Sequence, residues 1–449
     1  MTAVPNPLVQ VPPGVRWSAA TAAFQIEGAR IAGGRGRSIW DDFVDTPGRV
    51  RDGSTAEPGP DSFHRFAEDI DLLKRLGVDR YRFSISWVRV QPDCVGAPSS
   101  EGLAYYDRLV DGLLEAGVTP FPTLYHWDLP VGLERGGGWL SRDTAERFGA
   151  YADIVASALG DRAKHWYTIN EAVSTSLQGY AIGELAPGRH LLFDSLPTVH
   201  HQLLAHGRAT AALRAHGADA VGIVNNHTWV IPASDSEEDG RAAQLYDLIH
   251  NRMFAEPVLL GQYPDLAALG VEMPVQEGDL EAISAGADFY GVNYYNPTTI
   301  AAAADDDPVP FVQAPTEGAV HTGFGELWPI VPEGLTAFLV DAKHRYADSL
   351  PPVIIGENGA SFPEPDHVDG PIEDSERIAY LAGHIGAVAD AVSEGVDIEE
   401  YTVWSLLDNF EWADGFTQRF GLVHVDQESS RRTPKASYDW YRALIASTR

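Results

Sequence analysis

The sequence contains a single cysteine, Cys94, in 449 residues. A lone thiol cannot form a disulfide within the chain, so the sequence predicts a protein of a reducing compartment. The first residues also lack the basic segment and the apolar segment of a secretory signal, and we expect a cytoplasmic protein. The class of small secreted scaffolds held together by disulfides is therefore excluded.

Basic residues are scarce. Lysine and arginine number 32 against 64 aspartates and glutamates, which gives a formal net charge of −32. A chain of this charge repels phosphate groups, so we expect neither a nucleic-acid partner nor binding to an anionic membrane surface. Long apolar runs are missing as well, and none approaches the roughly 18 residues that cross a bilayer.

Metal and cofactor motifs are also missing from the sequence. His200, His201 and His206 are close together, but their spacing is not the i, i+4 spacing of a metal pair on a helix. The glycine-rich stretch Gly33–Ser38 lacks the spacing and the lysine of a phosphate-binding loop. We therefore expect no metal and no cofactor.

Eight β-prone runs alternate with stretches of helical periodicity, which predicts a single (β/α)8 barrel, a TIM barrel with its active site at the carboxyl ends of the strands. The helical stretches include Ser62–Leu76, which ends at Gly77. We expect one domain over residues 1–449, with residues 1–14 as an N-terminal lead. The predicted strands are Val15–Ser18, Tyr81–Trp87, Thr119–Leu124, His165–Glu171, Ala220–Asn225, Ala287–Asn293, Val353–Gly356 and Tyr401–Trp404.

Two of these runs end on a carboxylate. Glu357 follows the apolar run Val353–Gly356, and Glu171 follows the run His165–Asn170. In a parallel barrel both strand ends face the mouth where ligands bind, although an acidic residue at such a place can instead cap the next helix. Two facing carboxylates are what the hydrolysis of a glycosidic bond requires, one protonated and one ionised.

Around these residues the sequence resembles the family 1 glycoside hydrolases, the β-glucosidase group, from about Trp17 to Tyr441. The resemblance implies that Glu171, in Thr168–Ala172, is the general acid/base and that Glu357, in Ile355–Gly359, is the nucleophile. Ile169, Ala172 and Gly356 depart from the usual motifs, and Gly356 replaces a threonine beside the nucleophile. Retention then requires carboxylates about 5 Å apart.

The same resemblance implies roles for the residues around the two glutamates. Arg82, Asn293 and Tyr295 would support the nucleophile, with a structural ion pair as the alternative for Arg82. Core packing is the alternative for any one tryptophan. Trp328 would line the aglycone side. The remaining positions implied to bind the sugar are Gln25, His126, Trp127, Asn170, Trp404, Glu411, Trp412 and Phe420.

The sequence thus predicts a retaining β-glycosidase whose partner is a small β-glycoside, most simply a β-glucosidase acting on cello-oligosaccharides or on aryl and alkyl β-glucosides. Glu411 would repel a phosphate, so we expect an unphosphorylated sugar. Three alternatives remain open at this stage. They are a β-galactosidase, β-fucosidase or transglycosidase of the same fold, a sugar-binding barrel without catalysis, and a metal-dependent barrel hydrolase.

Overall fold

The computed structural model describes residue 9 and residues 11–304, 306–367 and 370–449. Residues 1–8 and 10 of the predicted N-terminal lead lie outside the described residues. Residues 11–14 form no helix or strand before the first strand begins at Arg16.

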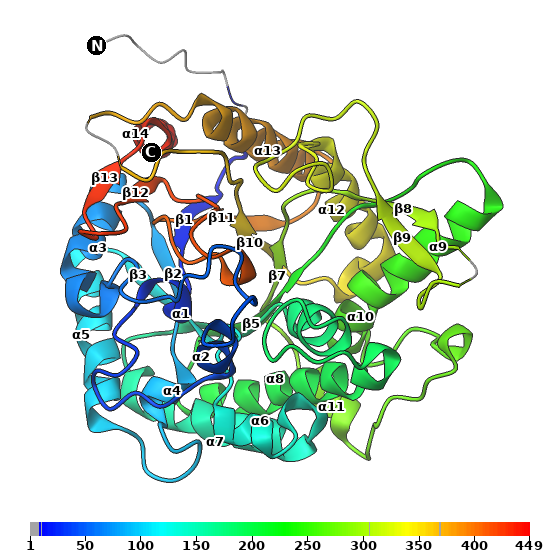
Figure 1. The fold of residues 1–449 in the computed structure, drawn as a ribbon, viewed down its shortest axis with the longest axis horizontal. Coiled ribbons are helices and arrows are strands. Elements are labelled where there is room, and N and C mark those ends of the chain that lie inside the picture. The colour runs from blue at the N-terminus through cyan, green and yellow to red at the C-terminus, as the bar shows by residue number, and fades with distance from the viewer. Residues whose placement is uncertain (1–8, 10, 305, 368–369) are drawn as a thin grey trace.

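Eight parallel strands form a closed barrel at the centre of the molecule, with the helices arranged around it (Figure 1). Every neighbouring pair is parallel, and each of the eight predicted strands is a barrel strand, so the predicted fold is confirmed. In the order of the barrel the strands are β1 (Arg16–Ala20), β11 (Ile398–Trp404), β10 (Val353–Asn358), β7 (Phe289–Asn293), β5 (Ala220–Asn226), β4 (His165–Asn170), β3 (Thr119–Tyr125) and β2 (Arg80–Ser84).

The barrel is filled by side chains rather than open. All six residues of β10 are buried, as expected for a strand covered on both faces. A separate cluster of buried apolar side chains, contributed by five different strands, closes the interior below the carboxyl ends. Its members are Phe121, Tyr167, Val224, Phe289 and Ile354. This part of the barrel interior is therefore packed and leaves no room for a ligand among these five side chains.

The helices follow the strands in sequence and cover the outside of the barrel. Helix α3 spans the predicted Ser62–Leu76 and ends at Gly77, whose φ of 82° suits a residue without a side chain. The other helices are α1 (Ala23–Ile26), α2 (Ile39–Val44), α4 (Trp87–Val90), α5 (Ser100–Ala116), α6 (Val131–Arg135), α7 (Arg142–Leu159), α8 (Pro197–Ala215), α9 (Glu237–Asp247), α10 (Met253–Leu260), α11 (Asp279–Ile283), α12 (Glu333–Tyr346), α13 (Ser375–Ser393) and α14 (Ala436–Ser447).

Short elements fill the connections. Two π-helical segments are η2 (Ser174–Ala181) and η4 (Leu248–Arg252), and the 3-10 turns are η1 (Gly138–Leu140), η3 (Leu192–Ser195), η5 (Ala267–Leu269), η6 (Ala347–Ser349) and η7 (Trp412–Asp414). Outside the barrel, β6 (Val230–Pro232), β8 (Thr298–Ala302) and β9 (Phe311–Ala314) form a small sheet, and β12 (Val423–Val425) pairs with β13 (Arg432–Pro434).

The predicted extent of the second strand is wrong at its end. The strand stops at Ser84, and Trp87 begins helix α4. The ring of Trp87 stacks on Tyr151 of α7 with centroids 4.9 Å apart, and its indole N–H donates to Gln91 one turn later. Packing between helices thus overrides the β preference of an aromatic residue at this position.

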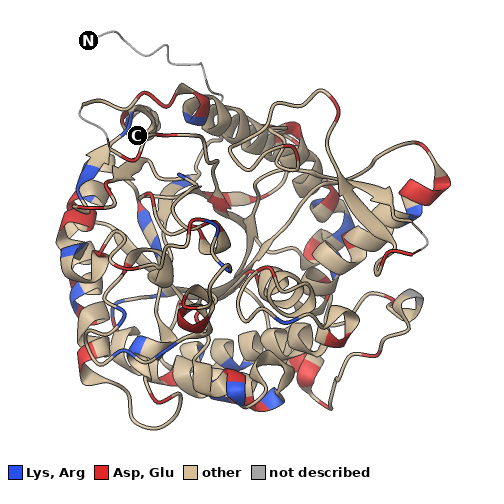
Figure 2. Ribbon diagram, in the orientation of Figure 1, with Lys and Arg blue, Asp and Glu red and all other residues tan. Residues whose placement is uncertain are grey.

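Charged residues are spread around the outer helices and loops, and acidic positions are found on every side of the molecule (Figure 2). Among the described residues, every helix is either too short or too polar to span a lipid bilayer.

Candidate active site

The predicted site residues gather at the carboxyl ends of the barrel strands. Asn170 and Asn293 are the last residues of β4 and β7, and Glu357 lies near the end of β10, opposite Asn293 in the strand register. Glu171 follows β4 directly, and its backbone N–H donates to Val224 of β5. Parallel strands therefore deliver two carboxylates, 186 positions apart in the chain, to the same end of one barrel.

Glu357 is buried and has a cation beside it. The Arg82 guanidinium donates to Glu357 Oε1 at 2.6 Å, and the Tyr295 hydroxyl donates to Oε2, also at 2.6 Å. Burial raises the pKa of Glu357 above its ordinary value, while the charge of Arg82 and the two hydrogen bonds act in the opposite direction.

Glu171 is equally buried but has only neutral donors. The Asn293 amide donates to Oε1 at 2.7 Å, and the Ser174 hydroxyl donates to Oε2 at 2.7 Å. Burial, followed by the negative charge of Glu357, raises the pKa of Glu171 to about 7. This carboxyl group is consequently the one that keeps a proton near neutrality.

Asn170 connects the surroundings of the two carboxylates. Its Oδ1 accepts from Arg82 at 2.6 Å and from Asn293 at 3.0 Å, and its amide donates to His126 Nε2 at 3.0 Å. Burial, with a smaller effect of Arg82, lowers the pKa of His126 well below its ordinary value, so the imidazole is neutral. An unbroken chain of contacts thus runs from Glu357 through Arg82, Asn170 and Asn293 to Glu171.

Gly356, the residue beside Glu357, has a defined place in this network. Its carbonyl accepts from Arg82 at 2.9 Å. A Cβ on residue 356 would lie 2.8 Å from Asn293 Oδ1 and 2.8 Å from a Val224 methyl group, so any side chain here requires one of them to move. The glycine lets Asn293 and Val224 lie close to the backbone of β10.

One side of the site carries polar groups suited to sugar hydroxyls. The Gln25 amide donates to Asn409 Oδ1 at 3.0 Å and to Glu411 Oε2 at 3.2 Å. Burial raises the pKa of Glu411 well above its ordinary value, and the charges of Asp414, Glu357 and Glu171 add to this effect. Gln25 lies in the short helix α1, directly after β1.

Aromatic rings form the rest of the wall. Trp412 lies 4.6 Å from Trp127 and stacks near His126 at 5.8 Å, between ring centroids, while the Trp127 indole donates to the Asn170 carbonyl. On the other side, one apolar cluster joins the end of β11 to the loops around it. It contains Ala20, Ala22, Tyr295, Phe324, Trp328, Trp404 and Phe420.

Three of the predicted residues have an unusual backbone. Glu171, Trp127 and Trp412 have φ angles of 49°, 79° and 50°, a region that residues with a side chain seldom adopt. Such conformations persist where the surrounding structure fixes them, and they concentrate at functional sites. At all three positions the chain turns sharply as it leaves or approaches the mouth of the barrel.

Comparison with known proteins agrees with this geometry. The sequence profile described as glycosyl hydrolase family 1 matches residues 9–449. The chain belongs to that family. It is 40% identical over 439 residues to β-glucosidase A of Thermotoga maritima, with 97% of each chain covered.

Two further relatives are similar along the whole length of this family 1 glycoside hydrolase. The crystal structure of the psychrophilic β-glucosidase BglU from Micrococcus antarcticus superposes with a TM-score of 0.92 at 43% identity, covering 98% of both chains. A bifunctional β-D-glucosidase/β-D-fucosidase of Bifidobacterium breve is 41% identical over 464 residues, covering 97% of this chain and 98% of the relative.

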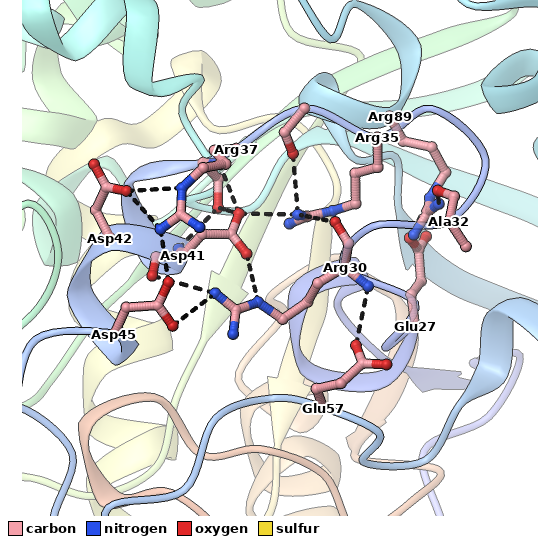
Figure 3. Close-up of polar contacts among 12 residues, drawn as sticks. Glu27, Arg30, Ala32, Arg35, Arg37, Asp41, Asp42, Asp45, Glu57 and Arg89 are labelled. Atoms are coloured by element: carbon pink, nitrogen blue, oxygen red, sulfur yellow. Dashed lines mark hydrogen bonds and ion pairs between the residues drawn. The ribbon is translucent and has the colours of Figure 1, made fainter.

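In this family 1 chain, a network of arginines and aspartates supports the wall of the site. Figure 3 shows Arg30 and Arg35 both pointing at the carboxylate of Asp41, at 2.8 Å and 2.9 Å. Asp41 also accepts from the backbone N–H of Ser38 and so fixes the start of α2. Trp40, on the same turn, lies 4.4 Å from Trp412 between ring centroids, and the network therefore holds a residue of the predicted sugar site in place.

One group of side chains among the described residues has the geometry of a metal site. Glu364, Asp408 and His424 bring ligand atoms within 4.8 Å of one another. The ammonium group of Lys435 lies 2.6 Å from Glu364 and 2.9 Å from Asp408, so a cation of the protein itself already lies between the two carboxylates.

Three residues that contact the predicted ones were not predicted from the sequence. Ser174 donates to Glu171 and lies three positions after it, a spacing that one helical turn would have suggested. Asn409 accepts from Gln25 and lies inside the stretch that supplied Trp404 and Glu411. Phe324 stacks on Trp328, and no pattern in its loop pointed to that contact.

Proposed function

We propose that this glycoside hydrolase is a retaining β-glucosidase that removes terminal glucosyl residues from cello-oligosaccharides and from aryl or alkyl β-glucosides. The observation that carries the proposal is the unequal surrounding of two buried carboxylates. Glu357 has the guanidinium of Arg82 at 2.6 Å, whereas Glu171 has only neutral donors and a pKa raised by burial and by Glu357 to about 7.

The chemistry follows from that difference. Ionised Glu357 attacks the anomeric carbon while protonated Glu171 gives its proton to the leaving oxygen, so that the bond to the aglycone breaks as the ester to Glu357 forms. Once Glu357 is esterified its charge is lost and the proton affinity of Glu171 falls. Glu171 then takes a proton from water, which attacks the anomeric carbon and releases Glu357.

The polar wall supports an unphosphorylated glycone. Gln25 and Glu411 hydrogen-bond to each other and supply polar groups for sugar hydroxyls, and the acidic residues gathered around Glu411, Asp414 and Glu357 among them, disfavour a phosphate. Glucose in this position is in keeping with the β-glucosidases of Thermotoga maritima and Micrococcus antarcticus to which the chain is similar.

Replacing Glu357 with Ala tests the proposal. We expect hydrolysis of 2,4-dinitrophenyl β-glucoside to fall by roughly 10⁴-fold or more, because the covalent step is lost. Added azide should enter the space left by the carboxylate and give the α-glucosyl azide. Undiminished hydrolysis by the variant, or a β-azide product, contradicts the assignment of Glu357.

A second activity, on β-fucosides, is favoured by the relative named for both glucosidase and fucosidase activity. Rates on nitrophenyl β-glucoside, β-galactoside and β-fucoside separate these possibilities, and a glucoside rate below both others contradicts the preferred glycone.

We also propose a cytoplasmic location, which the single cysteine supports, and one folding domain over residues 1–449. Cell fractionation and limited proteolysis test these two points.

A further inference from the structure

A short hairpin beside the site carries two aromatic residues. Residues 320–330 double back on themselves through hydrogen bonds from Ile330 to Val320 and from Thr322 to Trp328. The backbone N–H of Gly323 donates to the carbonyl of Ser361 at 2.7 Å. The tip of the hairpin is therefore fastened to the segment that follows β10, the strand that carries Glu357.

The aromatic rings form a continuous row from the nucleophile outward. Tyr295, which donates to Glu357, lies 5.6 Å from Trp328, and Trp328 stacks on Phe324 with centroids 4.3 Å apart and planes 19° from parallel. Phe324 also lies 5.7 Å from Phe420. Phe420 is buried, whereas Phe324 and Trp328 are only partly buried and keep part of their surface open to solvent.

The surface of this row differs in chemistry from the wall formed by Gln25 and Glu411. Phe324 and Trp328 pack in one apolar cluster, which also contains Tyr295, Trp404, Phe420 and two alanines. Farther along the hairpin, Leu327 and Val320 are 44% and 71% exposed. A second glucosyl unit needs hydrogen-bonding partners for its hydroxyls, whereas a flat apolar group gains from stacking on aromatic rings.

On the basis of the β-glucosidase function above, we propose that Phe324 determines specificity for the aglycone. Its ring covers one face of Trp328, which fixes the plane of the indole and extends the apolar surface. The pair selects a flat aromatic aglycone over a second sugar unit. Phe324 acts by positioning Trp328 and by direct contact with the aglycone, and it takes no part in binding the glycone.

The test compares two substrates that share the same glycone. For Phe324→Ala we expect kcat/KM on 4-nitrophenyl β-glucoside to fall roughly five- to tenfold, the magnitude of a lost aromatic contact, and kcat/KM on cellobiose to change less than about twofold. Competitive inhibition by glucose should stay unchanged, because glucose occupies only the glycone side. Phe324→Tyr keeps the ring and should restore the wild-type ratio of the two substrates.

Glu326→Ala is the matched control, since Glu326 is exposed on the same hairpin, and it should leave the ratio unchanged. An equal loss on both substrates, or an unchanged ratio, overturns the role of Phe324. If Phe324→Ala fails to fold by circular dichroism, the ratio in Phe324→Leu decides in the same way. A wild-type protein that cleaves no β-glucoside contradicts the proposed function itself, which is a different outcome.

Discussion

Two buried groups of charged side chains in this protein have carboxylates with opposite proton affinities. In the site, Glu171 is buried and its pKa is raised to about 7 by burial and by Glu357. In the second group, which we call the Lys435 cluster and define as Lys435, Asp408, Glu364 and Arg377, Asp408 is equally buried. Burial opposes its ionisation too, but Lys435, with help from His424, Arg419 and Arg377, holds the pKa of Asp408 well below its ordinary value.

Burial alone therefore does not decide whether a carboxylate is protonated. The Lys435 cluster pairs its carboxylates with cations, and the ammonium of Lys435 contacts two of them. The site supplies one cation, Arg82, to Glu357 and leaves Glu171 with amide and hydroxyl donors. Complete pairing suits a structural role, and incomplete pairing keeps a proton available for transfer.

The largest effect is expected on catalytic activity, from a change in the site. In Glu171→Gln the proton donor is lost, and we expect kcat/KM on cellobiose to fall on the order of 10³- to 10⁴-fold. The loss on 2,4-dinitrophenyl β-glucoside should be much smaller in the first step, because that leaving group departs without a proton. Steady-state kinetics on both substrates check this, and equal losses on both would contradict the acid role of Glu171.

The next largest effect is expected on protein stability, from a change in the Lys435 cluster. Lys435→Met leaves Asp408 and Glu364 buried without their ammonium, and we expect the free energy of unfolding to fall by about 3–5 kcal/mol. Urea denaturation measures the loss. At a temperature where the variant is folded, kcat/KM should stay within about threefold of wild type. A large loss of activity in fully folded protein would show that the cluster serves catalysis rather than structure.

The sequence predicted the site better than it predicted this cluster. Strand periodicity placed Glu171 and Glu357 at strand ends, and barrel closure then brings those ends together, whereas the pairing of Glu357 with Arg82 was implied by the family resemblance. Lys435, Asp408 and Glu364 lie on segments outside the barrel strands, where no periodicity constrains which residues meet. The end of β2 was missed because it depends on packing of Trp87 against Tyr151, which is distant in sequence. The stacking of Phe324 on Trp328 is local, but it depends on the turn of an irregular hairpin, where no periodicity applies.

The stability that Glu171 and Asp408 contribute should depend on pH in opposite directions. The folded-state pKa of Glu171 is raised to about 7, so this group contributes stability that is fully present below the ordinary value near 4.5 and is lost as pH rises through 7. The expected loss is about 3 kcal/mol between pH 4.5 and pH 8. Urea denaturation across this range should show a loss that is smaller in Glu171→Gln than in wild type by about 3 kcal/mol; the rest comes from other carboxyl groups whose pKa burial raises, Asp128 and Glu411.

Asp408 should behave in the opposite sense. Its folded-state pKa is lowered, so its contribution is present above the ordinary value and is lost only as pH falls through the folded-state pKa, in strong acid. Stability between pH 4.5 and pH 8 is therefore insensitive to Asp408. If Glu171→Gln kept the full wild-type dependence over that range, another buried carboxyl group, such as Glu411, would have to account for it.

The smallest effects are expected from the removal of a single hydroxyl group, one in the site and one beside the Lys435 cluster. Tyr295→Phe removes the hydrogen bond to Glu357, and we expect kcat/KM to fall about tenfold. Because that bond favours the ionised form, its loss raises the pKa of Glu357 and moves the acidic limb of the pH profile of kcat/KM to higher pH.

The matched change lies beside the Lys435 cluster. Ser437→Ala removes a hydroxyl donor from Asp374, a carboxylate that is paired with Arg377 of the cluster. There we expect a loss of about 1 kcal/mol in the free energy of unfolding and an unchanged pH profile of activity. The two variants remove the same kind of donor from carboxylates of similar burial, so only the role of the carboxylate differs. A shifted pH profile in Ser437→Ala, or an unshifted one in Tyr295→Phe, would show that hydrogen bonding to Glu357 does not tune the reaction.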